Sequence, residues 1–319
     1  MRITDTQKAT IRQQILRAIA LNRQPGYHFC GNFLEMVLHH NHDGHATVDM
    51  ATAPGIVDSL GHVSPTAVSV VADFALANAV RSTSNPAARL ATVSLNIQFN
   101  GPPLAGDIHA EGHLEAFFHE GQGRLGLSRA KIWASDTPVA FATSTFMVLP
   151  APAGTTLHPI PWINHPAPAI ELPKHETLSA DEQWIVQRAE EAFSRMEHED
   201  IDFLSALFGM DTQVNEQGAV ATLQNGFHVG NRVGHVQGGI TLGLAIKGAN
   251  AALPGPWRLT GLSASFVSPG EGDVLTSQAT VIHRGRLTAV VHNRVCGVNG
   301  RIVLEAISNH TRVVTKLDT

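Results

Sequence analysis

The sequence has few of the features that mark secreted, nucleic-acid-binding or membrane-spanning proteins. Its two cysteines, Cys30 and Cys296, lie in different halves of the chain, so we expect reduced thiols rather than a disulfide framework. Lysine and arginine form no cluster and the net charge is −5, which argues against a nucleic-acid partner. No apolar run reaches the ~18 residues of a membrane helix, and the first residues lack the apolar core of a signal peptide. We therefore expect a cytoplasmic protein that binds neither nucleic acid nor a membrane.

Charged residues are also scarce, at 15% of the chain, whereas soluble domains usually contain about 25%. Few surface charges indicate extensive burial, either between parts of the chain or between copies, so a homodimer is one expectation. Hydrophobic residues are abundant, at 43% of 319 residues, which is enough for a large core. A chain of this length predicts about two domains.

The two halves of the chain repeat one arrangement. Residues 58–65 read DSLGHVSP and residues 231–238 read NRVGHVQG, and each stretch leads directly into a strongly apolar segment that predicts a helix. The first of these helices, expected over 66–82, contains an acid, Asp73. The second has Ile246 at the matching place. The copies have therefore diverged in opposite ways, which indicates one composite site between them.

Proline divides the chain in the middle. Seven prolines between residues 150 and 173 predict a long extended connector, because proline fixes φ and donates no hydrogen bond. We therefore expect a first domain over 1–150, a linker over 151–180 and a second domain over 181–319.

Both halves have the same predicted order of elements. An amphipathic helix comes first, at about 6–22 and about 181–197, and a strand pair follows, opening at residues 33–34 and 203–204. Alternating and β-branched runs after each apolar helix predict several antiparallel strands. One buried helix among such strands predicts an α+β fold, with a curved antiparallel sheet wrapped around a central helix. Two such units would lose exposed edges by joining into one long sheet.

A buried helix that follows a short glycine-rich loop and precedes long strands resembles the hotdog fold. The pattern Asn-x6-Gly-Gly, present at Asn231, Gly238 and Gly239, resembles PaaI-like acyl-CoA thioesterases, in which an Asp lies eight residues after the first glycine. As a whole the chain resembles a tandem, double-hotdog acyl-CoA thioesterase. The resemblance covers nearly everything except the linker and the terminal helices.

In that family the site lies between two hotdog units, so the resemblance implies one composite site here. The second half would supply Asn231 and the Gly238 N–H, which would face the thioester carbonyl. The first half would supply the acid, Asp73, and a strand hydroxyl, Thr92. The sequence departs from the family pattern at Gln237, where histidine is usual, and at Thr92, where serine is usual and the preceding loop is one residue longer.

The residue types suit thioester hydrolysis. The reaction places negative charge on the carbonyl oxygen, and a helix N-terminus offers unpaired N–H groups to that oxygen. Gly238 permits a close approach to the backbone, and residues 237–239 are a poor helix start on stability grounds alone. Pro65, at the matching place, has no N–H and is no oxyanion donor. Because Ile246 also replaces the acid, we expect one active site per chain.

The roles of the three polar residues stay open at this point. Asp73 lies among apolar neighbours, where an ionised carboxylate is costly unless it is hydrogen-bonded. It would act as a base that activates water or as a nucleophile, unless it is exposed or paired with an ion such as Arg81, which lies two turns further on. Asn231 would position the carbonyl or form an ordinary turn. Thr92 would orient the attacking water or serve only as a strand residue.

For substrate binding we expect Gln237 and Gly239, beside the donor, and cations at the mouth of the pocket, because CoA carries phosphates. Arg284 and Arg286 form a basic hairpin turn and are the candidates, although solvated turn charges are common. A carrier protein would use similar patches, so acyl-CoA and acyl-carrier-protein substrates both remain open.

Histidines gather around the dipeptide at residues 43–44, at His39, His40, His42 and His45. A metal site is imaginable, but Asp-Gly between two strands is a hairpin turn signal, which we favour. We expect no metal and no redox cofactor.

The sequence thus predicts hydrolysis of an acyl thioester at one site between the halves. Three alternatives stay open: a hotdog hydratase or dehydratase, a tailoring enzyme for a carrier-bound polyketide, and a module that binds acyl thioesters without turnover. A hydratase would need a histidine beside Asp73, and none follows that residue closely in the sequence.

Overall fold

The computed structural model describes residues 3–58, 60–84, 88–120, 123–151, 153–154, 156–161, 163 and 168–313. The first half contains α1 (Asp5–Asn22), α2 (Phe29–Phe33), β1 (Met36–His42), β2 (His45–Met50), α3 (Pro65–Arg81), β3 (Arg89–Phe99), β4 (Ile108–Glu120), β5 (Gly123–Ala134) and β6 (Thr137–Leu149). The second half repeats this order with α4 (Ala180–His198), α5 (Phe203–Leu207), β7 (Thr212–Asn215), β8 (Gly218–Gln224), α6 (Gly238–Ala252), β9 (Trp257–Phe266), β10 (Val274–Arg284), β11 (Thr288–Cys296) and β12 (Ile302–Arg312). Short 3-10 turns lie at Pro54–Ile56, His175–Thr177 and Val298–Gly300.

The strands form one antiparallel sheet in the order β1-β2-β4-β5-β6-β3-β9-β12-β11-β10-β8-β7. The order is the same when it is traced inward from either end, so the sheet has an internal two-fold repeat. The halves join where β3 pairs with β9, in a register that sets Ser94 opposite Ser265 and Gln98 opposite Gly261. This pairing removes one open edge from each half. The predicted α+β fold of two edge-joined units is confirmed.

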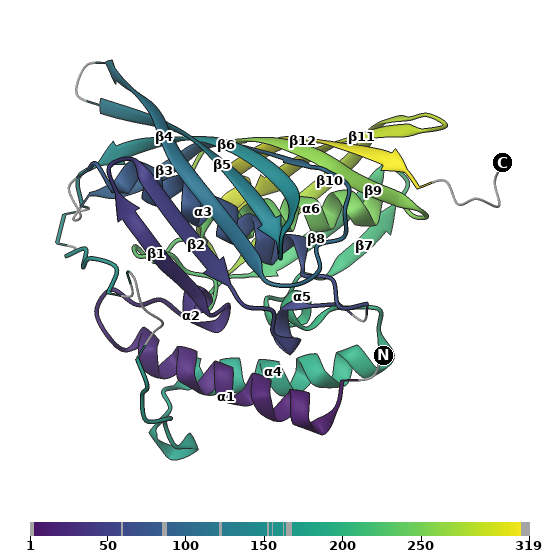
Figure 1. Ribbon diagram of the computed structural model, residues 1–319. Coiled ribbons are helices and arrows are strands. Elements are labelled where there is room, and N and C mark those ends of the chain that lie inside the picture. The colour runs from purple at the N-terminus through teal and green to yellow at the C-terminus, as the bar shows by residue number, and fades with distance from the viewer. Residues whose placement is uncertain are drawn as a thin grey trace.

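The helices α3 and α6 lie under the concave face of this sheet and form the middle of the molecule (Figure 1). Both are apolar on nearly every side and are buried along most of their length. They pack closely against each other because α6 carries glycine at the contact. A Cβ on Gly239 would lie 2.6 Å from the Cα of Val70, and a Cβ on Gly243 would lie 2.5 Å from the Thr66 side chain. Substitution of either glycine would push the halves apart.

The amphipathic helices α1 and α4 lie side by side in a third layer, on the far side of α3 and α6 from the sheet (Figure 1). Each begins with a capping box, Thr4 with Gln7 and Ser179 with Glu182, which explains where both helices start. Arg12 joins the two helices through hydrogen bonds of 2.6 and 2.7 Å to the Glu190 carboxylate.

The Asp43-Gly44 turn is confirmed, because both residues have positive φ and β1 pairs with β2 across them. The strand pairs predicted to open at residues 33–34 and 203–204 are wrong at that point. These residues lie in or next to the short helices α2 and α5, and the strands begin only afterwards.

Between β6 and α4 the described residues form no strand and only the 3-10 turn at His175–Thr177. Pro152 and Pro166, two of the seven linker prolines, lie outside the described residues. The division of the chain at residues 150 and 180 stays a prediction.

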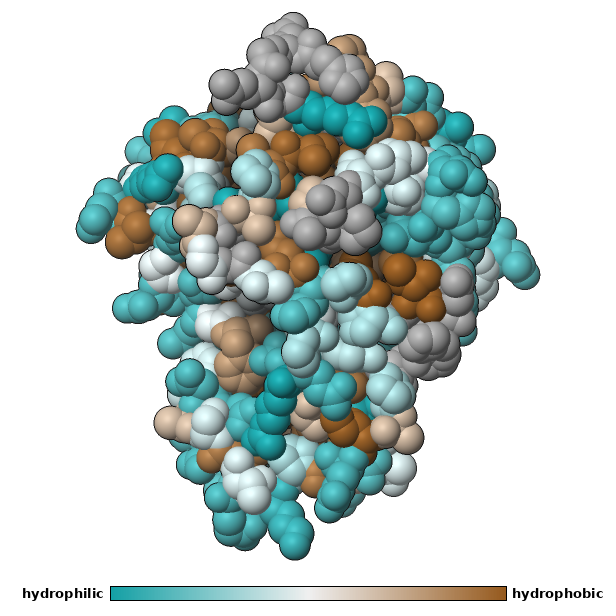
Figure 2. All heavy atoms as spheres, turned by 90° about the vertical axis from the view of Figure 1, so that its left-hand side faces the viewer, coloured by the Kyte–Doolittle hydropathy of each residue, from teal (hydrophilic) through white to brown (hydrophobic). Residues whose placement is uncertain are grey.

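The described part of the chain has no helix long and apolar enough to cross a membrane. Figure 2 shows hydrophobic residues in several separate patches on one face, with hydrophilic residues between them. A homodimer of double hotdogs stays a prediction.

Candidate active site

Asp73 is the buried acid at the junction of the halves. It lies on α3 with 6% of its surface exposed, and its Oδ2 accepts a hydrogen bond of 3.2 Å from the Gly239 N–H of α6. The Thr92 hydroxyl, on β3, donates to Oδ1 over 3.3 Å. Burial raises the pKa of Asp73 to about 6, and the hydrogen bonds from Gly239 and Thr92 oppose that rise. The carboxylate is therefore ionised at neutral pH but is more basic than an exposed one.

The first turn of α6 faces this carboxylate. Gln237 is the N-cap residue and its side chain makes no capping hydrogen bond. The Gly239 N–H is taken by Asp73, whereas the Gly238 N–H has no hydrogen-bond acceptor among the described residues. A Cβ on Gly238 would lie 3.0 Å from the Thr92 Oγ1 and 3.1 Å from the Asp73 Oδ2. The bare backbone at this position leaves one free N–H next to the acid, at the positive end of the helix dipole.

These groups open into a cavity of about 110 Å³ that both halves line. Its wall contains five of the predicted site residues, Asp73, Thr92, Asn231, Gln237 and Gly238. Gly239 contacts Asp73 but does not line the cavity. The other lining residues are His28, Phe74, Ala77, Asn78, Arg81, Arg89, Leu90, Phe146, Leu157, Ile160, Arg232 and Val233.

Asn231 also supports the loop before α6. Its Oδ1 accepts hydrogen bonds from the N–H groups of Val233 and His235, over 3.0 and 3.2 Å. Asp58 makes the same pair of contacts in the first half, so this turn does not depend on an amide. Asn231 differs from Asp58 in its Nδ2 group, which is a hydrogen-bond donor that an aspartate lacks. Beside it, the Oε1 of Gln237 is buried without a hydrogen-bond partner in the described residues.

The cations at this cavity are not those predicted. Arg284 and Arg286 do not line it. Arg284 instead lies over the Trp257 ring, with its Cζ 5.8 Å from the ring centroid, so a role for this pair in substrate binding stays a prediction. Three other arginines line the cavity, Arg81, Arg89 and Arg232.

Arg81 is the most buried of these three arginines. Burial and the nearby positive charge of Arg232 lower its pKa to about 9. Its Nη1 donates to the Ala88 carbonyl, and its Nε has no partner among the described residues. Arg232 donates to the His158 carbonyl. Positive charge therefore collects at this cavity.

Sequence reasoning also missed residues that only folding brings to the cavity. His28 lies against Phe74, with ring centroids 6.3 Å apart, and burial and the charge of Arg232 lower its pKa to about 4. The imidazole is therefore neutral. Leu157 and Ile160 come from the proline-rich linker and form part of the wall. Nothing in the local sequence marks any of these three residues as belonging to a site.

Residues 229–310 match the family model of the acyl-CoA thioesterase N-terminal domain. The matched segment begins just before the loop that leads to α6 and ends in β12. In this chain the domain thus occupies the second half. Its description agrees with the resemblance that the Gly-Gly pattern gave.

Several solved structures have the same fold over nearly the whole chain. A 12:0-ACP thioesterase from Umbellularia californica superimposes with a TM-score of 0.52 at 11% identity, covering 85% of this chain and 95% of its own. A protein described as an oleoyl thioesterase from Lactobacillus plantarum gives 0.53 at 9%, covering 90% and 98%. A protein described as a thioesterase from Novosphingobium aromaticivorans gives 0.53 at 11%, covering 87% and 99%. The chain therefore has a double-hotdog fold, and its residues 229–310 match a thioesterase domain. No curated protein matches the double-hotdog chain in sequence.

Proposed function

We propose that this protein hydrolyses acyl thioesters at one composite site between its two hotdog units. The observation that carries the proposal is the meeting of Asp73 with the first turn of α6. A basic, buried carboxylate from one half and a free backbone N–H from the other lie at one cavity, and the Gly238 Cβ position is within 3.1 Å of the carboxylate. A base and an oxyanion donor are the two groups that water needs to attack a thioester.

In the proposed mechanism Asp73 removes a proton from a water molecule, and the water oxygen attacks the thioester carbonyl carbon. The negative charge that forms on the carbonyl oxygen is stabilised by the Gly238 N–H, with the Asn231 Nδ2 as a second donor. Collapse of the tetrahedral intermediate breaks the carbon–sulfur bond, and the thiolate takes up the proton. Thr92 and the Gly239 N–H fix the carboxylate through one hydrogen bond to each oxygen, and each oxygen keeps a second lone pair that can accept the proton of the water. Direct attack by Asp73 is the other route.

The place equivalent to this site by the internal repeat, where the N-terminus of α3 meets α6, supports a single active site. There Ile246 occupies the position of the acid and Pro65 that of the donor glycine. With neither a base nor a donor, that position has no means of hydrolysis, so we propose one turnover site per chain.

The three arginines support a thioester whose thiol carries phosphate. We propose acyl-CoA as the substrate, in agreement with the description of the matching family model. The phosphate groups would contact Arg89 and Arg232, because these side chains line the cavity and neither is in an ion pair with a described carboxylate. A phosphopantetheine arm on a carrier protein would use fewer of these contacts.

The test is release of free thiol from short-, medium- and long-chain acyl-CoAs, followed with a thiol reagent. We expect steady-state release by the wild type and its loss in Asp73→Asn. Asp136→Asn removes an exposed carboxylate of the β5–β6 turn and is the matched control, expected to retain full activity. Thiol release that persists in Asp73→Asn, or that is absent from every acyl-CoA and acyl-carrier protein, would overturn the proposal.

His28 favours a second candidate, water addition to an enoyl thioester. A hydratase uses an acid and a histidine at one site, and His28 and Asp73 line the same cavity. Water addition to an enoyl-CoA, seen as loss of its ultraviolet absorbance and abolished by His28→Gln, would favour this candidate. Tight binding of acyl-CoA with neither reaction would favour a binding module. A cytoplasmic location stays a prediction.

A further inference from the structure

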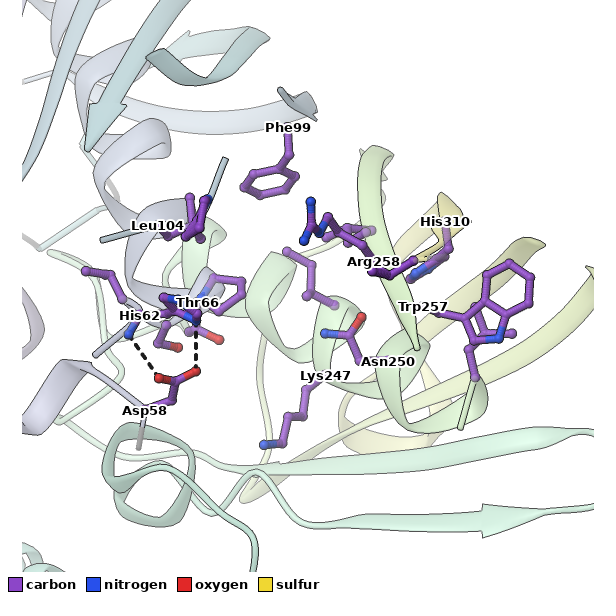
Figure 3. Close-up of a pocket in the computed structure, with 18 of the residues that line it drawn as sticks. Asp58, His62, Thr66, Phe99, Leu104, Lys247, Asn250, Trp257, Arg258 and His310 are labelled. Carbon is purple, nitrogen blue, oxygen red and sulfur yellow. Dashed lines mark hydrogen bonds and ion pairs between the residues drawn. The ribbon is translucent and has the colours of Figure 1, made fainter. Parts of the chain in front are cut away.

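A second cavity, larger than that at Asp73, lies at the pseudo-equivalent place, where the loop before α3 meets α6 and β9 (Figure 3). Its volume is about 580 Å³, within the range of small-molecule sites. The first half supplies the N-terminus of α3, and the second half supplies the helix, the reverse of the candidate active site. The two cavities are thus the two copies of one interface position.

The catalytic groups of the active site are all replaced here. Ile246 stands for Asp73 and Pro65 for Gly238. The strand registers of the two halves show which residue is equivalent to Thr92. Thr92 pairs with Phe146 across β3 and β6, and Leu259 pairs with His310 across β9 and β12. Leu259 therefore occupies the position of Thr92 and has no hydroxyl, and His310 occupies that of Phe146.

The apolar wall residues have changed in the opposite direction. Lys247, Asn250 and His310 occupy the positions of Phe74, Ala77 and Phe146. Three wall positions that are apolar at the active-site cavity are thus polar at this cavity, which suits a ligand with a polar group.

Most of the charges at this cavity are already paired. The Lys247 Nζ lies 3.6 Å from the Asp202 carboxylate, and the His62 Nδ1 lies 3.6 Å from that of Asp58. Arg258 is different. Its Nη1 donates to the Gly101 carbonyl over 2.7 Å, but no carboxylate of the described residues forms an ion pair with it. One cation therefore remains for a ligand.

His310 supplies a second unsatisfied group on the same wall. It is 1% exposed, its Nε2 lies 3.1 Å from the Ser308 Oγ, and its Nδ1 is buried without a partner among the described residues. A buried polar atom without a partner is costly, and a ligand that accepts its hydrogen bond would remove that cost. Burial lowers the pKa of His310 to about 4, so the ring is neutral at pH 7 and has one N–H. That N–H lies on Nδ1 when the Ser308 hydroxyl donates to Nε2 instead of to the Val291 carbonyl, 3.4 Å away.

Apolar side chains line part of the remaining wall, whereas Asp58, Asp202 and three hydroxyl side chains line another part. Figure 3 shows Phe99 and Leu104 on one side and Trp257, Arg258 and His310 on the other. A ligand between them would have an apolar body against Phe99, Leu104 and the Trp257 ring, and an acidic head against Arg258 and His310.

We propose that this second cavity binds an amphipathic carboxylate, an acid with an aliphatic chain, without chemical conversion. The carboxylate would accept hydrogen bonds from the Arg258 guanidinium and the His310 Nδ1, and the chain would lie along Phe99, Leu104 and Trp257. The proposed hydrolysis releases acids of this kind, so the second cavity would be a regulatory site for the product. Binding itself does not depend on that activity and is tested without it.

Trp257 provides the readout. Decanoate is titrated into the wild-type protein while tryptophan fluorescence is followed, and calorimetry gives the stoichiometry. We expect saturable binding, with decanol weaker by about tenfold because it lacks the charge. Arg258→Met and His310→Phe, which restores the residue of the other half, are each expected to weaken decanoate binding by about tenfold. Arg312→Met, an exposed cation outside the cavity, is the control and should bind as the wild type does.

Thermal unfolding within about 2 °C of the wild type establishes that each variant is folded. The proposal is overturned if decanoate does not bind, if decanol binds equally well, or if both cavity variants retain wild-type affinity. Loss of thiol release in Asp73→Asn with decanoate binding intact would separate this site from the hydrolytic one. If no thioester is hydrolysed and the two cavity variants still lose decanoate, the proposed function fails and this inference stands.

Discussion

Replacing Asp73 with asparagine is expected to abolish hydrolysis and, at neutral pH, to stabilise the fold. The pKa of the carboxyl rises from 3.8 to about 6 on folding because the group is buried. A shift of about two units corresponds to about 3 kcal/mol at ~1.4 kcal/mol per unit, and this is the cost of holding the ionised group in the folded protein. Asparagine carries no charge at any pH, retains an oxygen for the Gly239 N–H and offers an N–H₂ group to Thr92.

The sign of the pH dependence follows from the raised pKa. Below the unfolded pKa of 3.8 the carboxyl is protonated in both states and costs nothing. The stability that the protonated carboxyl gives the folded state is lost as the pH rises through about 6, where the folded carboxyl ionises. The Asp73→Asn variant is therefore expected to unfold with a free energy about 2–3 kcal/mol higher than that of the wild type at about pH 8, and the difference should shrink towards about pH 4.

Urea unfolding at several pH values measures this difference, with Asp136→Asn as the exposed control, for which no pH-dependent change is expected. A free-energy difference that is the same at both ends of the range would refute the reasoning. So would a variant that is less stable than the wild type at about pH 8, because Asp73 would then stabilise the fold as an ordinary paired carboxylate.

Three further predictions follow from the same contacts. The kcat/KM for an acyl-CoA should rise with pH and level off above an apparent pKa of about 6, the value of Asp73; a profile without this limb would exclude the residue as the base. Gly238→Ala should lower kcat by about 10²-fold with a small change in stability, because its Cβ would enter the space for the oxyanion, 3.0 Å from the Thr92 Oγ1. Gly239→Ala should instead lower the free energy of unfolding by about 3 kcal/mol, because its Cβ would lie 2.6 Å from a backbone atom of α3, and urea unfolding measures this loss. Arg89→Met should raise KM for an acyl-CoA about tenfold but leave that for the acyl-N-acetylcysteamine thioester unchanged, and an equal effect on both would place the phosphates elsewhere.

Local patterns predicted most of the elements. The helix of residues 66–82 was predicted from its continuous apolar character and lies at Pro65–Arg81, because such a helix is stable only when surrounded by other elements. The alternating runs after each apolar helix also predicted strands, and two of these runs, residues 93–99 and 260–266, lie in β3 and β9. The error at Phe33 and Phe203 has an ordinary cause: a short apolar run is compatible with either a strand or one helical turn, and burial against the neighbouring helices favoured the turn.

The sequence by itself determined the duplication, the central helices, and the asymmetry between Asp73 with Gly238 and Ile246 with Pro65, because each of these is written in residues close together in the chain. Only the tertiary structure decided which side chains share a cavity. Asn231, Arg232 and Gly238 meet Asp73 because β3 pairs with β9 and α3 packs on α6. Those contacts join residues more than a hundred positions apart, and no local periodicity encodes them. His28 and Leu157 reach the same cavity from other parts of the first half and from the linker. The same pairing created the second cavity, whose altered wall is visible in the sequence only after the register of β9 and β12 is known.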